Sequence, residues 1–311
     1  MKTLRLLALA LSCALLLLSC ADVQGARTDT LPSSKDEVAV AFIDGGEKSA
    51  LTGAADGAKR GTSDFCNSHG FRFIELACAE QNDASRAAAI RSAVSSGACA
   101  IVCTGYYMSR AVIGAGNEYP NVSFLCLDTM APEAELDETL SSNVHFVVPD
   151  CADAGYLSGR VSAKYAKVHA ISAMMRMDTV LDCLCGFVQG ISDGGGAEIL
   201  VSVDAGLGTN NAGKLMTEVM SDLLYERGAD AVTAYGALIY PCSVSAGAHG
   251  EKYISIFDMS YDASSRLPSP VFDCAASVTS CLGRLYSNGM KWSARDAGTC
   301  SEEGISEGSV S

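Results

Sequence analysis

Basic residues are scarce in this chain of 311 residues. Lysine and arginine number 22 against 36 aspartates and glutamates, which gives a formal net charge of −14 at pH 7. Such an acidic chain repels the phosphates of nucleic acids and the headgroups of anionic membranes, so the composition argues against both as partners. With 49% hydrophobic residues, the chain can bury a core larger than that of one typical domain.

The sequence also lacks the motifs of common enzymes and metal sites. It has no C-x-x-C pair and its four histidines are scattered, so we expect no metal centre. Gly190-Ile191-Ser192-Asp193-Gly194 fits the G-x-S-x-G pattern, but a helix precedes it where a hydrolase needs a strand. Gly206-Leu207-Gly208 lacks the third glycine of a dinucleotide fingerprint, and no P-loop occurs. We expect no cofactor and no enzymatic activity.

Only one long apolar run is present, and it lies at the N-terminus. Residues 6–18 follow Lys2 and Arg5 and end in Leu17-Leu18-Ser19-Cys20, which resembles the lipobox of a bacterial lipoprotein signal. This resemblance implies cleavage after residue 19, lipidation of Cys20 and a flexible tether over residues 20–36; the alternative is an ordinary secretory signal with a chance cysteine. We expect a protein anchored to the bacterial cell membrane by lipid, facing the periplasm or the cell exterior.

Cysteine is abundant, with fourteen in the chain. Cys99, Cys103 and Cys126 lie in predicted strands, where cysteine acts as a small buried hydrophobic residue. An oxidising compartment would permit disulfides among cysteines expected at the surface, and the sequence leaves their pairing open. These cysteines are Cys66, Cys242, Cys274, Cys281 and Cys300.

A unit of about thirty residues occurs twice in the chain. Residues 97–105 (GACAIVCTG) are echoed by residues 228–236 (GADAVTAYG), and each copy leads to an apolar strand that ends in aspartate, at Asp128 and Asp258. The repeat predicts two similar α/β lobes with parallel sheets. Ligands of such sheets bind beyond the carboxyl ends of the strands, where both aspartates are expected.

Alternation of apolar runs and amphipathic stretches predicts the elements of each lobe. We expect a first lobe over 37–140 plus about 260–290, a second lobe over 141–259 and a flexible tail over 291–311. Asp83 is the expected N-cap of a helix over 84–96, and a last helix over 271–286 is expected to return to the first lobe. The expected strands are 38–43, 71–77, 99–104, 122–128, 144–148, 168–174, 198–203, 230–235 and 254–258.

Several short motifs, in this order and spacing, resemble the basic membrane protein (Bmp) family. They are Asp44-Gly45-Gly46, Glu118-Tyr119-Pro120-Asn121-Val122, Gly155-Tyr156-Leu157-Ser158-Gly159, Gly186-Phe187-Val188-Gln189-Gly190 and residues 227–232. These proteins are lipoprotein receptors of ABC transporters and are similar to the purine nucleoside receptor. The resemblance implies a type I periplasmic-binding fold, with two Rossmann-like lobes joined by a hinge that close on the ligand.

The resemblance also implies ligand residues. Asp44 matches the aspartate that follows the family's first strand, and Asp128 and Asp258 match strand-end aspartates that bind ribose or base in the family. An ionised carboxylate accepts hydrogen bonds from ribose hydroxyls; the alternative is that strand-end aspartates cap the following helices. Ser49 matches a serine of the first turn, and Gly236 falls in a loop near the ligand. We expect the ligand-binding residues to be Asp44, Ser49, Tyr106, Asp128, Gly236 and Asp258.

The chain departs from the family where the nucleoside base would stack. Ala50 and Leu51 stand in place of a stacking Phe and an Asn, Cys183 in place of a second Phe, and Asp273 in place of a basic residue. A stacking aromatic contributes about 1–3 kcal/mol. A tyrosine from a strand end could replace it, although each candidate also suits ordinary packing; the candidates are Tyr106, Tyr107, Tyr235 and Tyr240.

The expected function is therefore a lipid-anchored receptor that delivers a nucleoside to an ABC permease and its ATPase. The alternative is a divergent member that no longer binds nucleosides and acts as a sensor or surface-interaction lipoprotein.

Overall fold

The computed structural model describes residues 38–46, 54–105, 107–127, 140–173, 178–196, 198–203, 211–234, 239–250, 252–256, 267–268, 270, 272–304, 306 and 309. The predicted signal peptide (1–19), tether (20–36) and lipidation residue Cys20 lie outside these residues. Within these ranges, no helix has the length and apolar character needed to cross a membrane.

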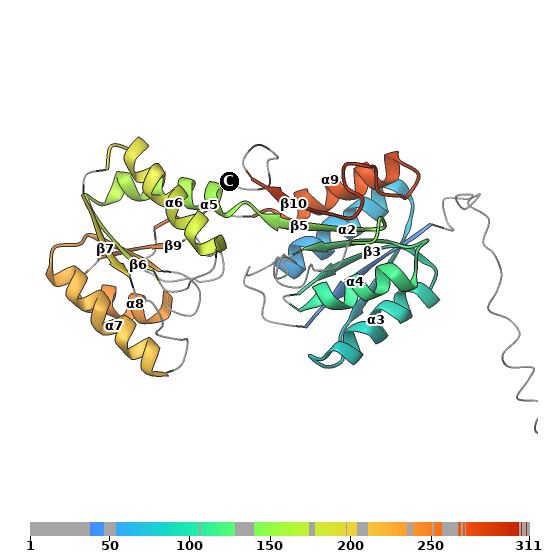
Figure 1. Cartoon of the computed structure of the whole chain (residues 1–311), viewed down its shortest axis with the longest axis horizontal. Helices are drawn as coiled ribbons and strands as arrows, with labels where there is room; N and C mark the ends of the chain where they lie inside the picture. The colour runs from blue at the N-terminus through green and yellow to red at the C-terminus, as the bar shows by residue number, and fades with distance from the viewer. Residues whose placement is uncertain are drawn as a thin grey trace, which may run out of the picture. The chain divides into compact units, whose positions relative to one another are not determined.

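Five strands from the first half of the chain and one from its C-terminal part form a parallel sheet of six strands in the order β10-β5-β4-β3-β1-β2 (Figure 1). Its central strands are buried on both faces, which explains their unbroken apolar sequences. The strands are β1 (Ala39–Asp44), β2 (Arg72–Ala77), β3 (Ala98–Thr104), β4 (Ser123–Leu127), β5 (Val144–Pro149) and β10 (Thr299–Glu303).

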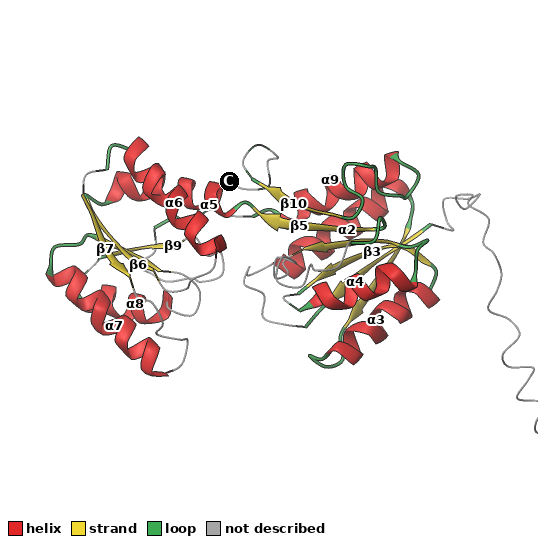
Figure 2. Ribbon diagram, viewed as in Figure 1, coloured by secondary structure: helices red, strands yellow, loops and turns green. Residues whose placement is uncertain are grey.

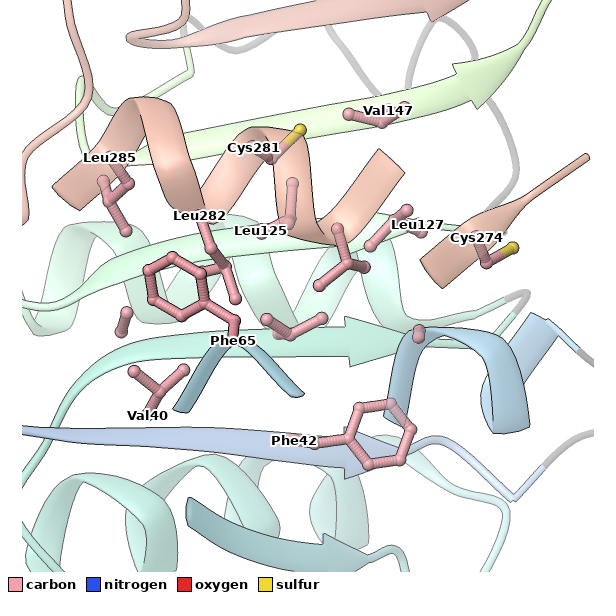
Figure 3. Packing of buried hydrophobic residues seen from close by; sticks show 14 of the residues in the cluster. Val40, Phe42, Phe65, Leu125, Leu127, Val147, Cys274, Cys281, Leu282 and Leu285 are labelled. Carbon is pink, nitrogen blue, oxygen red and sulfur yellow. The ribbon is translucent and has the colours of Figure 1, made fainter. Parts of the chain in front are cut away.

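Helices cover both faces of this sheet. Helices α2 (Ala54–His69) and α9 (Cys274–Ser287) lie on one face, and α3 (Asp83–Ser95) and α4 (Met108–Glu118) lie on the other (Figure 1). On the first face, Phe65 of α2 and Leu282 of α9 pack against Val40 and Leu125 of the sheet (Figure 3). The last helix thus returns to the sheet built from the start of the chain, as the sequence predicts.

A second parallel sheet has four strands in the order β7-β6-β8-β9 (Figure 2). Its strands are β6 (Val168–Ala173), β7 (Glu198–Val203), β8 (Ala231–Ala234) and β9 (Tyr253–Ile256). Its helices are α5 (Cys151–Tyr165), α6 (Asp178–Asp193), α7 (Asn211–Glu226) and α8 (Ile239–Ala248). The alternation of strands and helices in parallel sheets confirms the predicted α/β class.

Polar side chains mark where several helices begin. Asn82, rather than the expected Asp83, is the N-cap of α3, and its side chain accepts the Ser85 N–H at 2.8 Å. Asp83 is one residue inside the helix and binds Arg86 instead. Asp150 caps α5 in the same way, through the Asp153 N–H.

Two strands lie in positions that the sequence did not predict. β5, expected in the second lobe, is an inner strand of the six-stranded sheet, and β10 lies within the expected flexible tail. The polar composition of the tail suggested disorder, but Trp292 is only 6% exposed and donates a hydrogen bond to the Phe124 carbonyl at 3.1 Å. An apolar run predicts a strand without saying which sheet it joins, so the membership of β5 depends on contacts distant in sequence.

Helices α5 and α6 are in backbone contact through glycines. A Cβ atom on Gly155 would collide with the Cys183 carbonyl oxygen, and one on Gly159 would collide with Phe187 and lie 2.9 Å from the Ile191 nitrogen. On α6, a Cβ atom on Gly186 would collide with the Ala152 carbonyl oxygen of α5, and one on Gly190 would collide with the Tyr156 carbonyl oxygen. The spacing Gly-x-x-x-Gly on both helices therefore positions one helix directly against the other.

Candidate functional site

The candidate site begins with a row of residues at the carboxyl end of the six-stranded sheet. Asp44 of β1 is in register with Thr104 of β3, which is in register with Leu127 of β4. Because side chains alternate along a strand, Asp44 lies on the face of Val40 and Phe42, the face that α2 and α9 cover. This edge is where parallel sheets of this kind bind ligands.

Glycine turns follow both β1 and β3. The Asp44 carboxylate accepts the Gly46 N–H at 2.9 Å, and Gly46 has a φ of +74°. The Gly45 N–H donates to the Thr104 carbonyl at 2.8 Å, and a Cβ on Gly45 would lie 2.7 Å from that oxygen. The two turns are thus in backbone contact, and this fixes the Asp44 carboxylate at the sheet edge.

Thr104 carries a buried hydroxyl that lacks a partner. Its side chain is 1% exposed, and its Oγ1 forms no hydrogen bond with any part of the chain that the structure describes. A buried polar atom left unpaired costs about 1–3 kcal/mol, so such an atom calls for an explanation. Sequence analysis missed Thr104, although its place as the last residue of a strand next to Asp44 was a usable signal.

Of the predicted ligand residues, Asp44 alone lies in the part of the chain that the structure describes. It stands at the carboxyl end of β1, as expected. The others lie outside the described residues, and their roles stay predictions; they are Ser49, Tyr106, Asp128, Gly236 and Asp258.

The described residues among the departures and the candidate substitutes lie in different surroundings. Asp273 caps α9 by accepting the N–H groups of Ala275 and Ala276, each at 3.0 Å. Tyr107 is 56% exposed, with the Arg86 guanidinium 5.6 Å from its ring centroid. Tyr240 is 62% exposed on α8. Ala50, Leu51 and Tyr235 lie outside the described residues.

The cysteines proposed for surface disulfides are mostly inside the protein. Cys66, Cys242, Cys274 and Cys281 are buried, which corrects the expectation of exposure; only Cys300 of that set is exposed. Burial raises the pKa of Cys66 and Cys281 to about 12 and that of Cys242 to about 11, so these groups stay protonated thiols. The twelve cysteines within the described ranges are all free. Among the same residues, no cluster of three His, Cys, Asp or Glu side chains could hold a metal ion.

Comparison with known proteins agrees with this architecture. The sequence profile of the Bmp family, described as ABC transporter substrate-binding protein PnrA-like, matches residues 43–292. A search of curated proteins found no match.

Solved structures show the same fold at low sequence identity. A solute-binding protein of an ABC transporter system from Conexibacter woesei has a TM-score of 0.62 and 16% identity, covering 88% of this chain and 87% of that one. A transcriptional activator of the comK gene from Bacillus halodurans has a TM-score of 0.60 and 16% identity, with 88% and 89% covered. An ABC transporter periplasmic solute-binding protein from Actinobacillus succinogenes with bound D-allose has a TM-score of 0.54 and 12% identity, with 86% and 95% covered. These similarities confirm the type I periplasmic-binding fold.

Proposed function

Because the chain belongs to the Bmp family of ABC transporter substrate-binding proteins, we propose that it is a lipid-anchored extracytoplasmic receptor for a nucleoside. It delivers this ligand to an ABC permease driven by a separate ATPase. Cys20 carries the lipid, and residues 20–36 tether the folded part of the chain to the membrane. A Cys20→Ala variant that still partitions with membranes would contradict the anchor.

The observation that carries this proposal is the pair of Asp44 and Thr104. A carboxylate and a buried hydroxyl that has no partner among the described residues stand in register at the carboxyl end of two neighbouring parallel strands. A carboxylate accepts hydrogen bonds from sugar hydroxyls, and a threonine hydroxyl both donates and accepts. The pair therefore suits a ligand rich in hydroxyl groups, such as the ribose of a nucleoside.

The remaining ligand contacts are assigned by family resemblance. Ser49, Tyr106 and Asp128 complete the site from the first lobe (37–140 with 260–290), and Gly236 and Asp258 contribute from the second lobe (141–259). The two lobes close over the ligand, as receptors of this fold class do. Ala50 stands at the position of the family's stacking Phe, and Tyr106 stacks on the base in its stead.

Calorimetric titration of ligand-free protein with a panel of nucleosides tests the proposal. We expect one nucleoside to bind, and we expect Asp44→Asn to weaken that binding by about 10- to 100-fold, because a hydrogen bond to a charged group contributes about 1.5–3 kcal/mol. The amide of this variant can still accept the Gly46 N–H, so the turn is kept. Asp64→Ala, on the exposed side of α2, is the matched control and should leave the affinity unchanged.

Thr104→Val separates a ligand contact from a structural role. If the hydroxyl binds ligand, this variant loses affinity while its thermal stability is kept or raised, because the unpaired hydroxyl has been removed. If no nucleoside gave heat on titration, the result would instead favour a sensor or surface-interaction lipoprotein. Residues 50 and 51 support this alternative, because they lack the family's stacking Phe and its Asn.

A further inference from the structure

A pair of cysteines lies where α5 and α6 begin their contact. Cys151 is the first residue of α5, directly after its N-cap Asp150, and Cys183 is in the second turn of α6. Cys151 is half-buried and packs against the cluster formed by Cys183, Phe187 and Ile191. The two thiols therefore belong to one small core between the helices.

The glycine contact sets the distance between the two helices at this point. Gly155, one turn after Cys151, faces the backbone of Cys183, and Gly159 faces Phe187 one turn further along α6. The two helices run in the same direction through these contacts, so Cys151 and Cys183 stand at the same end of the pair. A disulfide needs Cα atoms within about 4.4–6.8 Å, which helices in backbone contact can supply.

The two thiols also contact each other directly. The side chains of Cys151 and Cys183 interact with each other, and the Cys151 thiol donates a hydrogen bond to the Pro149 carbonyl at 3.7 Å. The interaction with Cys183 lowers the pKa of Cys151 against the opposing effect of burial, while the same interaction and burial raise the pKa of Cys183. Cys151 is also the more exposed of the two thiols, and it lies in the first turn of α5, where a helix N-terminus favours the thiolate form.

We propose that Cys151 and Cys183 form a redox-responsive disulfide that joins the first turn of α5 to α6. The Cys151 thiolate attacks one sulfur of an oxidant disulfide, forms a mixed disulfide and releases one thiolate of the oxidant. Cys183 then loses its proton and attacks the Cys151 sulfur, which forms the protein disulfide and releases the second thiolate. Two electrons pass to the oxidant, and the two protein protons end on its two released thiols.

The position of the pair gives the disulfide a structural effect. Only Asp150 separates β5, an inner strand of the six-stranded sheet, from Cys151. The bond would therefore fix the segment through which the chain leaves one sheet for the helices of the other. An extracytoplasmic location supplies the oxidising conditions that such a bond requires, and the inference does not depend on the identity of the ligand.

Peptide mapping of the purified full-length protein tests this proposal. The protein is reduced, equilibrated with mixtures of reduced and oxidised glutathione, quenched in acid and alkylated, and its peptides are sequenced by mass spectrometry. We expect a cross-linked peptide that joins Cys151 to Cys183 and has lost two hydrogens, in most molecules once oxidised glutathione is in excess. If Cys151 and Cys183 of the wild-type protein are both found alkylated when oxidised glutathione is in excess, the proposal is wrong.

Cysteine variants establish which thiols react. Cys183→Ser should reduce the cross-link to background and leave Cys151 bound to glutathione as a mixed disulfide. Cys185→Ser is the matched control, because Cys185 is exposed on the same helix two residues away, and it should leave the cross-link unchanged. Equal pairing of Cys151 with Cys185 and Cys183 would overturn the proposal, because it would show that the contact between the helices does not select the partner.

Discussion

The backbone contact between α5 and α6 predicts that Gly159→Ala destabilises the protein. Gly159 lies within a helix, so the added methyl group raises no backbone strain of its own. The obstacle is the facing helix: a Cβ would collide with the Phe187 carbonyl and lie 2.9 Å from the Ile191 nitrogen. Because backbone atoms of a packed helix cannot rotate away as a side chain does, α5 and α6 must separate.

Two opposing effects set the magnitude. Overpacking a closely packed contact costs about 1–3 kcal/mol, and a collision with backbone lies at the upper end of that range. Replacing a helical glycine by alanine gains about 1 kcal/mol in helix propensity. The net loss is therefore about 2 kcal/mol in the free energy of unfolding.

Urea unfolding followed by circular dichroism measures this loss. With an m-value of about 2–3 kcal/mol/M, the midpoint should fall by roughly 0.7–1 M. Gly114→Ala is the matched control: this glycine is exposed within α4, and its Cβ would have no atom within 4 Å. That variant should gain about 0.5–1 kcal/mol. If both alanine variants were more stable than the wild type, the helices would not be in backbone contact and the reasoning would be refuted.

Two further predictions concern His145 of β5, which contacts the C-terminal residues Thr299 and Ser301, and Trp292. Burial lowers the pKa of His145 in the folded protein. As pH drops below about 6.5, the histidine is therefore protonated in the unfolded chain while it is still neutral in the folded protein. The free energy of unfolding should then fall by up to about 1.4 kcal/mol per pH unit. His145→Gln should flatten this slope between pH 7.5 and 5.5 in urea titrations, and an unchanged slope would contradict the assignment. Trp292→Ala should lose about 3–5 kcal/mol through its cavity, and Trp292→Phe about 1 kcal/mol through the missing bond to Phe124. Both losses are measured by urea unfolding with circular dichroism, and an unchanged stability of Trp292→Phe would contradict a role for the indole N–H.

Much of the fold could be predicted from local sequence pattern. The apolar runs that end at Asp44, Thr104 and Leu127 form strands. They are apolar throughout because helices cover both faces of a parallel sheet, so no face is left for alternating polar residues. Their alternation with helices fixed the parallel class. The N-cap of α3 was displaced by one residue, from Asp83 to Asn82, because both residues have side chains that can cap a helix.

What the sequence could not supply depends on contacts between distant residues. β10 carries Ser301 and Glu303, which look like solvated tail residues until β5 pairs with them. Cys281 looked suited to a surface disulfide because nothing local shows that α9 turns it inward. At the candidate site, the motif identified Asp44. Thr104 is identified only from the structure, which shows that its hydroxyl is buried and has no hydrogen-bond partner among the described residues.

One of the two edge strands of the six-stranded sheet, β10, comes from residues 299–303. β10 covers the edge of β5, and the whole four-stranded sheet is translated between these two strands. The inner strand β5 therefore stays unpaired along one side until the residues of β10 have been translated. The six-stranded sheet is thus completed by a pairing between residues far apart in the sequence, and contacts of that kind form slowly because the entropy of closing a long loop must be offset first.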